Sequence, residues 1–428
     1  MCQHTHNYDE QPVPVMAGDR FPWHLPICDA HCHPTDTMDS IQDIPSMRAA
    51  ALTIMATRLQ DQDLVADVAR KHSNKDLKQL FQDDNSGECN ACVFPSFGWH
   101  PWFSHLLYDD SADTPTYRPA SGSGPGSSSG SDTGPDSGPG PGSSSDSDSE
   151  STAAAKQAHY NAVLQPEPSP EFVASLPTPV AVSTFLKETE SRLSANPHAL
   201  VGEIGVDKAF RLPEPWNPSE HAERDSTLTA GGREGRRLSP HRVRIEHQRE
   251  ILAAQLRLAA KTRRAVSVHG VQAHGVLHDT LAATWKGHER EYISRRKRRL
   301  VAKGAEDFSD EEDDDSEKPY PPRICLHSFS ANVEVLKQYL NPTIPARIFV
   351  SLSTAVNLST DASSAKTDEI LRALPDDSIL VESDLHIAGE HMDQALENMY
   401  RHVCEVKGWE LEEGVKRIAK NYEEFILG

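Results

Sequence analysis

The 428-residue sequence has little of several features that define protein classes. Only 37% of its residues are hydrophobic, and they occur in short blocks between polar, compositionally biased tracts, so a sizeable core can form only outside those tracts. Basic residues are outnumbered, with 43 Lys and Arg against 64 Asp and Glu, for a formal net charge of −21. This charge balance argues against a protein that binds nucleic acid through a broad basic face, because neutralising phosphates requires clustered Lys and Arg.

The chain also has few cysteines, and its first residues are polar. Its seven cysteines are odd in number, and several lie in apolar, strand-like runs, which is typical of reduced thiols in an intracellular protein. Cys89 and Cys92 form a C-x-x-C pair, but neither a second pair nor a helical His nearby completes a four-ligand zinc site, which favours a packing role. Residues 1–19 lack the apolar core of a signal peptide or a membrane span. We therefore expect a soluble intracellular protein with no membrane segment.

Three polar intervals interrupt the sequence, at 111–157, 213–240 and 286–322. The first consists mostly of Gly, Ser, Pro and Asp, a composition that cannot offset the entropy lost when a chain is ordered. The other two have a similar character with more charge. We expect all three to be disordered or irregular insertions within one folded unit that spans residues 1–428.

Between these intervals, short apolar runs alternate with longer segments of helical period. This alternation is typical of parallel strands that are buried on both faces and joined by crossover helices. Eight strands are predicted, at 26–30, 51–56, 91–97, 199–206, 265–269, 323–327, 346–352 and 378–384. Helices are predicted after nearly every strand, as at 61–72, 241–261, 333–340, 367–374 and 388–406. Eight such units predict a TIM (β/α)8 barrel with its active site at the carboxyl ends of the strands.

Polar side chains stand where these strands are predicted to end. His31 and His33 are two residues apart, so an extended chain points both imidazoles to the same side, where they can bind one cation. Glu203 lies among glycines, where a carboxylate can approach two metal ions and bridge them. Three further strands end at His269, His327 and Asp384. A core or surface role would explain any one of the 21 histidines, but five strand ends that all carry His, Glu or Asp favour a metal site.

Six motifs surround these residues: DAHCH at 29–33, GWHP at 98–101, GEIGVD at 202–207, VSVH at 266–269, LHSFS at 326–330 and ESD at 382–384. In order and spacing they resemble the TatD-type metal-dependent deoxyribonucleases of the amidohydrolase superfamily. The resemblance covers most of the chain outside the polar intervals. One departure concerns the last motif, because TatD enzymes usually have Pro two residues after its Asp, where this chain has His386.

The resemblance implies two divalent cations. It assigns one to His31, His33 and Asp384 and the other to His269 and His327, with Glu203 as the bridge. Oxygen and nitrogen ligands without thiolate fit Mg²⁺, Mn²⁺ or Zn²⁺.

The resemblance also implies roles in catalysis and substrate binding. Asp384 would be the general base as well as a ligand, with Glu203 as the second catalytic residue. His100, Asp207 and Arg211 would lie near the substrate phosphate.

The implied activity is that of a 3′-to-5′ exonuclease or related phosphodiesterase acting on DNA, as single strands or 3′ ends. Two other functions stay open. A metal site of this kind would serve amides, lactones or phosphoesters equally, so the substrate can also be a small ester or amide. The three insertions are similar to those of a fungal branch, some of whose members are described as interacting with a subunit of the anaphase-promoting complex. An adaptor for a cell-cycle protein is therefore the third possibility.

A run of five basic residues at 295–299 is followed by acidic residues from Glu306 onward. The basic run matches a nuclear-import signal, and the two runs together match a solvated, charge-paired loop. The nucleus and the cytoplasm are both expected locations.

Overall fold

The main sheet of the protein is parallel. The computed structural model describes residues 20–73, 80–81, 91–118, 145–216, 224–292 and 317–428. Eight strands within these ranges pair in the order β1-β2-β3-β7-β9-β10-β11-β12, and all neighbours are parallel. Their bounds are β1 Cys28–Cys32, β2 Ala51–Met55, β3 Cys92–Phe97, β7 Leu200–Asp207, β9 Val266–Val271, β10 Arg323–Leu326, β11 Arg347–Leu352 and β12 Ile379–Val381.

The first and last strands of the sheet meet at their carboxyl ends. The His33 N–H donates to the Leu385 carbonyl at 2.8 Å, and the Asp384 N–H donates to the His31 carbonyl at 3.0 Å. These bonds bring the two edges together into a nearly closed barrel. The predicted TIM barrel is therefore confirmed, and the carboxyl ends of its strands gather at one mouth.

Apolar side chains fill the opposite, amino end of the barrel. Phe94, Phe349 and Leu380 pack there with Tyr422 and Phe425 of helix α13 (Leu411–Leu427). The alternate residues of the same strands, such as Ile348 and Val350, pack with the surrounding helices in a second, larger cluster. Strands buried on both faces need nearly continuous apolar runs, so their positions could be predicted from the sequence.

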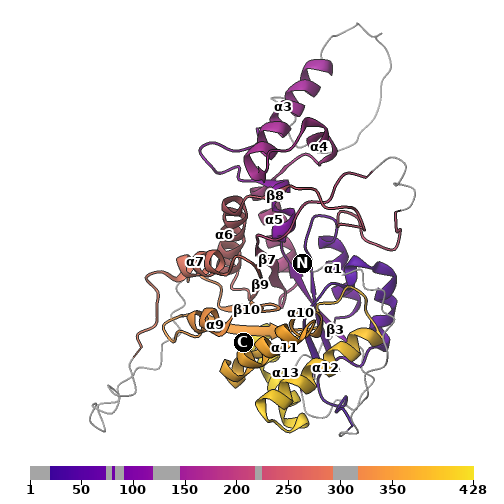
Figure 1. The fold of residues 1–428 in the computed structure, drawn as a ribbon, viewed down its shortest axis with the longest axis vertical. Helices are drawn as coiled ribbons and strands as arrows, with labels where there is room; N and C mark the ends of the chain where they lie inside the picture. Colours follow the sequence, from indigo (N-terminus) through magenta and orange to yellow (C-terminus); the bar gives the residue numbers. More distant parts are fainter. Residues whose placement is uncertain (1–19, 74–79, 82–90, 119–144, 217–223, 293–316) are drawn as a thin grey trace.

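Helices surround the barrel (Figure 1). Helix α6 begins four residues later than predicted, at Ile245, because Arg242–Val243 form a short strand instead. Helix α11 begins six residues earlier than predicted, because Thr360 and Ser363 form a capping box at its start. The helices of this layer are α1 Gln62–Lys71, α5 Val182–Ala195, α6 Ile245–Lys261, α7 His274–Trp285, α9 Val333–Tyr339, α10 Thr354–Asn357, α11 Asp361–Ala373 and α12 Glu390–Lys407.

Strands β10 and β12 end earlier than the sequence indicated, each beside the barrel mouth. β12 ends at Val381 instead of 384, and β10 ends at Leu326 instead of 327. The chain turns there through left-handed conformations, with φ of 56° at Asp384 and 41° at Ser328. Non-glycine residues rarely adopt such angles, and those that do are frequent at functional sites.

Parts of the predicted insertions form regular structure. Helix α3 (Ser145–Val163) and helix α4 (Pro170–Ser175) build a small lobe at the top of Figure 1, where Tyr160 and Phe172 pack with Leu212. The expected irregularity therefore does not extend to the end of 111–157, because apolar residues beyond 157 anchor the helix. In the interval 213–240, the described residues include Thr229, whose N–H donates to the Asp36 carbonyl at 2.9 Å.

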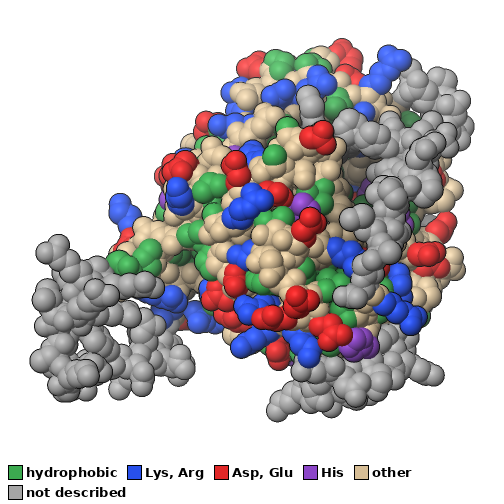
Figure 2. All heavy atoms as spheres, turned by 60° about the horizontal axis from the view of Figure 1, so that its bottom comes forward, with side chains coloured by type: hydrophobic (Ala, Val, Ile, Leu, Met, Phe, Trp, Pro, Cys, Tyr) green, Lys and Arg blue, Asp and Glu red, His purple; other side chains and the backbone are tan. Residues whose placement is uncertain are grey.

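Some predictions fall on residues outside the described ranges. The basic run at 295–299 and Cys89 both lie there, as do 119–144, 217–223 and 293–316 of the three intervals. On the face drawn in Figure 2, Lys and Arg are interspersed with Asp and Glu. None of the helices that the structure describes combines the length and the apolar character that crossing a membrane requires.

Candidate metal centre

The barrel mouth brings together the six residues predicted to bind metal. Glu203 of β7 lies at the centre, and its two carboxylate oxygens face different histidines. Oε1 lies 2.8 Å from His269 Nδ1 and 3.1 Å from His327 Nε2. Oε2 lies 3.3 Å from His33 Nε2 and 3.5 Å from His31 Nε2. The carboxylate therefore lies between the two histidine pairs that the resemblance assigns to separate cations.

Asp384 completes one side of this cluster. Its Oδ1 lies 3.7 Å from His33 Nε2, and its side chain is 18% exposed where that of Glu203 is 4% exposed. His31, His33 and Asp384 each offer a ligand atom, and these three atoms lie within 4.8 Å of one another. The carboxylate that solvent can reach is thus Asp384, at the rim of the mouth.

Glycines allow the strands to approach closely around Glu203. A Cβ on Gly202 would lie 2.9 Å from Ser96 Oγ of β3, and one on Gly205 would overlap the His269 carbonyl oxygen of β9. Gly205 also has a φ of 155°, which L side chains rarely adopt. The glycines of the GEIG motif therefore hold Glu203 close to the neighbouring strands.

The histidine nitrogens that face away from Glu203 have partners of their own. His31 Nδ1 lies 2.9 Å from Ser267 Oγ, and His269 Nε2 lies 3.3 Å from Asp207 Oδ2. Both nitrogens of His269 face carboxylates, so the ring can donate to Asp207 and to Glu203; a cation bound at Nδ1 would leave the ring proton on Nε2, toward Asp207. Metal-binding histidines commonly have such outer partners, which fix the ring and its tautomer.

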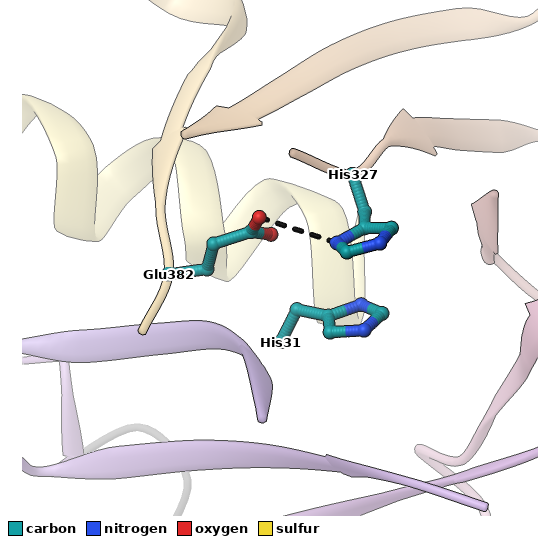
Figure 3. Close-up of side chains that lie close together, drawn as sticks. All are labelled: His31, His327 and Glu382. Carbon is teal, nitrogen blue, oxygen red and sulfur yellow. Dashed lines mark hydrogen bonds and ion pairs between the residues drawn. The ribbon is translucent and has the colours of Figure 1, made fainter. Parts of the chain in front are cut away.

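Glu382 is the outer partner of His327, a role that the sequence analysis did not assign. Its Oε1 accepts from His327 Nδ1 at 3.2 Å, from the Ser328 N–H at 2.8 Å and from Ser328 Oγ at 2.5 Å, while Ser351 Oγ donates to Oε2. Figure 3 shows this bond, with the imidazole of His31 alongside that of His327. The two rings are stacked, with centroids 3.7 Å apart. The available sequence signal was a carboxylate directly after an apolar strand, and the structure buries it fully.

The structure gives His100 a definite bond to Glu203. His100 Nδ1 accepts the Trp102 backbone N–H at 3.2 Å, so the proton of its neutral ring is on Nε2. That nitrogen lies 3.1 Å from Glu203 Oε1 and therefore donates to it. Although His100, Glu203 and His269 are close enough to share a cation, this tautomer makes His100 a donor to the carboxylate.

The other two predicted substrate contacts lie differently. Asp207 is buried at the end of β7, beside His269 and Trp102. Arg211 is exposed, and within the described ranges no hydrogen bond or ion pair joins it to the cluster. The structure thus brings Asp207 to the centre and leaves Arg211 at the surface.

Burial and charge shift the pKa values in opposite directions across the cluster. Burial, with the charge of His327, lowers the pKa of His31 to about 3. Burial would also lower the pKa of His33 and of His269, but hydrogen bonds to Glu203, and in His269 first to Asp207, raise both to about 9. The histidines hold the pKa of Glu203 well below its usual range despite burial.

These shifts describe a buried negative charge that needs compensation. Protons on His33 and His269 provide it in the arrangement above. Divalent cations compete for the same nitrogen lone pairs, because metal binding displaces protons from its ligands. The donor set of imidazoles and carboxylates fits such a cation.

The sequence matches a known protein family. The profile described as TatD related DNase matches residues 28–427. The chain belongs to this family. The resemblance read from the six motifs is thereby confirmed, and the buried His, Glu and Asp clusters are consistent with the metal binding typical of TatD proteins.

Two relatives cover nearly the whole chain. Cut9-interacting protein scn1 of Schizosaccharomyces pombe is 33% identical over 401 residues, which are 94% of this chain and 98% of that protein. The uncharacterized deoxyribonuclease YMR262W of Saccharomyces cerevisiae is 24% identical over 367 residues, 84% of each chain.

Solved structures with similar folds are more distant in sequence. A TatD homologue of Escherichia coli, YJJV, is 13% identical with a TM-score of 0.46, covering 94% of this chain and 97% of that chain. An uncharacterized amidohydrolase of Saccharomyces cerevisiae is 11% identical with a TM-score of 0.49, covering 94% and 99%.

Proposed function

We propose that the protein is a TatD-type deoxyribonuclease that uses two divalent cations, Mg²⁺, Mn²⁺ or Zn²⁺, to hydrolyse phosphodiester bonds from 3′ ends or in single strands of DNA. One observation carries the proposal. The two oxygens of Glu203 face two separate histidine pairs, at distances between 2.8 and 3.5 Å. A relative that is named a deoxyribonuclease supports the choice of DNA.

The chain would hold one cation with His31, His33 and Asp384 and the other with His269 and His327, with Glu203 shared between them. Bound there, the cations would lower the pKa of a water molecule and stabilise charge on the attacking and leaving oxygens. Asp384 is the carboxylate at the rim, so it is placed to accept the proton of the attacking water. His100 keeps its Nε2 proton on Glu203 and so fixes the carboxylate between the two pairs.

A matched set of assays tests this proposal. Purified protein is freed of metal with a chelator, titrated with Mg²⁺, Mn²⁺ or Zn²⁺, and assayed on end-labelled single-stranded and double-stranded DNA. We expect metal-dependent release of nucleotides from the 3′ end. Absence of DNA hydrolysis with all three metals, alongside metal-dependent hydrolysis of a small ester or amide, would replace the nuclease with the second kind of hydrolase.

A binding function is the second candidate, and one observation favours it. The relative named for its interaction with Cut9 is 33% identical along almost its whole length. The corresponding proposal is an adaptor that binds a cell-cycle protein through the outside of the barrel. Partner binding that survives both metal removal and Glu203→Gln would support the adaptor, while a salt-dependent affinity for single-stranded DNA would support the nuclease.

A further inference from the structure

Trp102 reaches the candidate metal centre through Asp207. It belongs to the 3-10 helix Pro101–Leu106, directly after the GWHP motif. Its indole Nε1 donates to Asp207 Oδ2 at 2.6 Å, and the same oxygen lies 3.3 Å from His269 Nε2. The other nitrogen of His269 lies 2.8 Å from Glu203 Oε1. A continuous set of polar contacts thus leads from the indole to Glu203.

Both oxygens of Asp207 are engaged by this chain. Oδ1 accepts the backbone N–H groups of Ala209 at 2.6 Å and Phe210 at 3.0 Å. Oδ2 accepts from Trp102 and faces His269. A buried carboxylate with these donors is held in one rotamer, and its negative charge would repel a substrate phosphate. The geometry therefore favours a role for Asp207 toward His269 over the substrate contact inferred from sequence.

The indole ring is itself held in place. Phe210 stacks on it with ring centroids 4.5 Å apart and an angle of 9° between the planes. The His100 ring meets it edge to face, at 4.7 Å and 82°. With both contacts in place, the N–H can point to Asp207 without a further loss of side-chain freedom.

We propose that Trp102 is a positioning residue of the metal centre, whose N–H fixes Asp207 so that His269 turns Nδ1 toward Glu203. The inference rests on the proposed metal site. Without the N–H, Asp207 Oδ2 loses its shorter bond, and the His269 ring loses the fixed acceptor that sets its tautomer. Changes to such outer partners typically weaken metal binding about 10- to 100-fold.

Trp102→Phe tests this role, because it keeps a flat ring against Phe210 and removes the N–H. Trp99→Phe is the matched control, because Trp99 directly precedes His100 in the GWHP motif and its Nε1 donates to the Phe103 carbonyl at 2.8 Å instead. The measurements are the affinity and stoichiometry of Zn²⁺ alone, by calorimetric titration of the metal-free full chain. We expect Trp102→Phe to weaken one of the Zn²⁺ sites at least about 10-fold and Trp99→Phe to leave both affinities unchanged.

A double-mutant cycle with Asp207→Asn separates positioning from packing. If Trp102 acts through Asp207, Trp102→Phe weakens Zn²⁺ binding in the wild-type background and adds nothing in the Asp207→Asn background. Thermal melts and near-ultraviolet circular dichroism confirm that each variant is folded, and Asp207→Asn alone must also weaken the site.

Three results would overturn the inference: wild-type affinity in Trp102→Phe, an equal loss in both backgrounds, or wild-type affinity in Asp207→Asn. Failure of the proposed function is distinct, because wild-type protein that binds Zn²⁺ but hydrolyses no DNA would overturn the nuclease and leave the positioning role of Trp102 standing.

Discussion

The hydrogen bonds around Glu382 determine how much stability the substitution Glu382→Gln should cost. Glu382→Gln keeps the shape of the side chain, and its amide oxygen can still accept from His327 Nδ1 and the Ser328 N–H, both of which now meet Oε1. The amide NH₂ then faces Ser351 Oγ, which can turn from donor to acceptor. We therefore expect a stability loss of only about 1 kcal/mol, the net value of one hydrogen bond.

The expected effect of Glu382→Gln on metal binding is larger than its effect on stability. The buried charge of Glu382 favours a proton on His327 Nδ1, so that the lone pair of Nε2 would be available to a cation bound beside Glu203. An amide holds that proton less strongly, so we expect metal affinity to fall about 10- to 100-fold. Glu382→Ala should instead leave the buried N–H donors of His327 and Ser328 without an acceptor. At about 1–3 kcal/mol each, this costs roughly 2–6 kcal/mol.

Urea unfolding of the metal-free protein and Zn²⁺ titration of the folded protein measure these two quantities separately. The reasoning fails if Glu382→Gln binds Zn²⁺ as tightly as the wild type. It also fails if Glu382→Ala unfolds at the wild-type urea concentration.

Three further predictions concern other parts of the chain. Burial lowers the pKa of His105 to about 3 and of His159 to about 4, below the unfolded value of about 6.5. The unfolded state therefore binds more protons than the folded state. As the pH falls from 6.5 toward 4, the free energy of unfolding of the metal-free protein should decrease by up to about 1.4 kcal/mol per pH unit for each histidine. Urea unfolding measures this decrease, and a free energy of unfolding that does not change with pH would contradict it. Gly205→Ala should abolish metal binding or folding, because its Cβ would overlap the His269 carbonyl oxygen; a folded variant with wild-type Zn²⁺ affinity would show that β7 can move away. Neutral residues in place of 295–299 should shift a fluorescent fusion from nucleus to cytoplasm, and an unchanged distribution would favour the solvated loop.

The main features of the barrel could be predicted from the sequence because each depends on a local pattern of residues. Continuous apolar runs marked the strands, and the two-residue spacing of His31 and His33 put both rings on one side. Parallel strands share a mouth, so strand ends far apart in the chain could be assigned to one cluster. The structure gathers Glu203, His269 and Asp384 there for that reason.

Contacts between distant side chains could not be derived in the same way. Trp102 and Asp207 are 105 residues apart, and no periodicity relates an indole in a turn to the end of a strand. The left-handed turn at Asp384 was hidden because the preceding residues continue the pattern of a strand. The start of helix α3 lies in a Ser- and Asp-rich stretch, and apolar packing farther along, such as that of Tyr160, identifies it only in three dimensions.

The most direct test of the two-metal nuclease is Glu203→Gln. The substitution keeps the size of the side chain and removes the negative charge that both histidine pairs face. Metal content is counted by elemental analysis and hydrolysis is measured on a DNA oligonucleotide, with exposed Glu412 on α13 changed to Gln as the control. We expect about two equivalents of metal in the wild type, about one in Glu203→Gln, and a fall in hydrolysis by orders of magnitude with the fold intact. Fewer than about one equivalent in the wild type, or wild-type hydrolysis by Glu203→Gln, would contradict the mechanism.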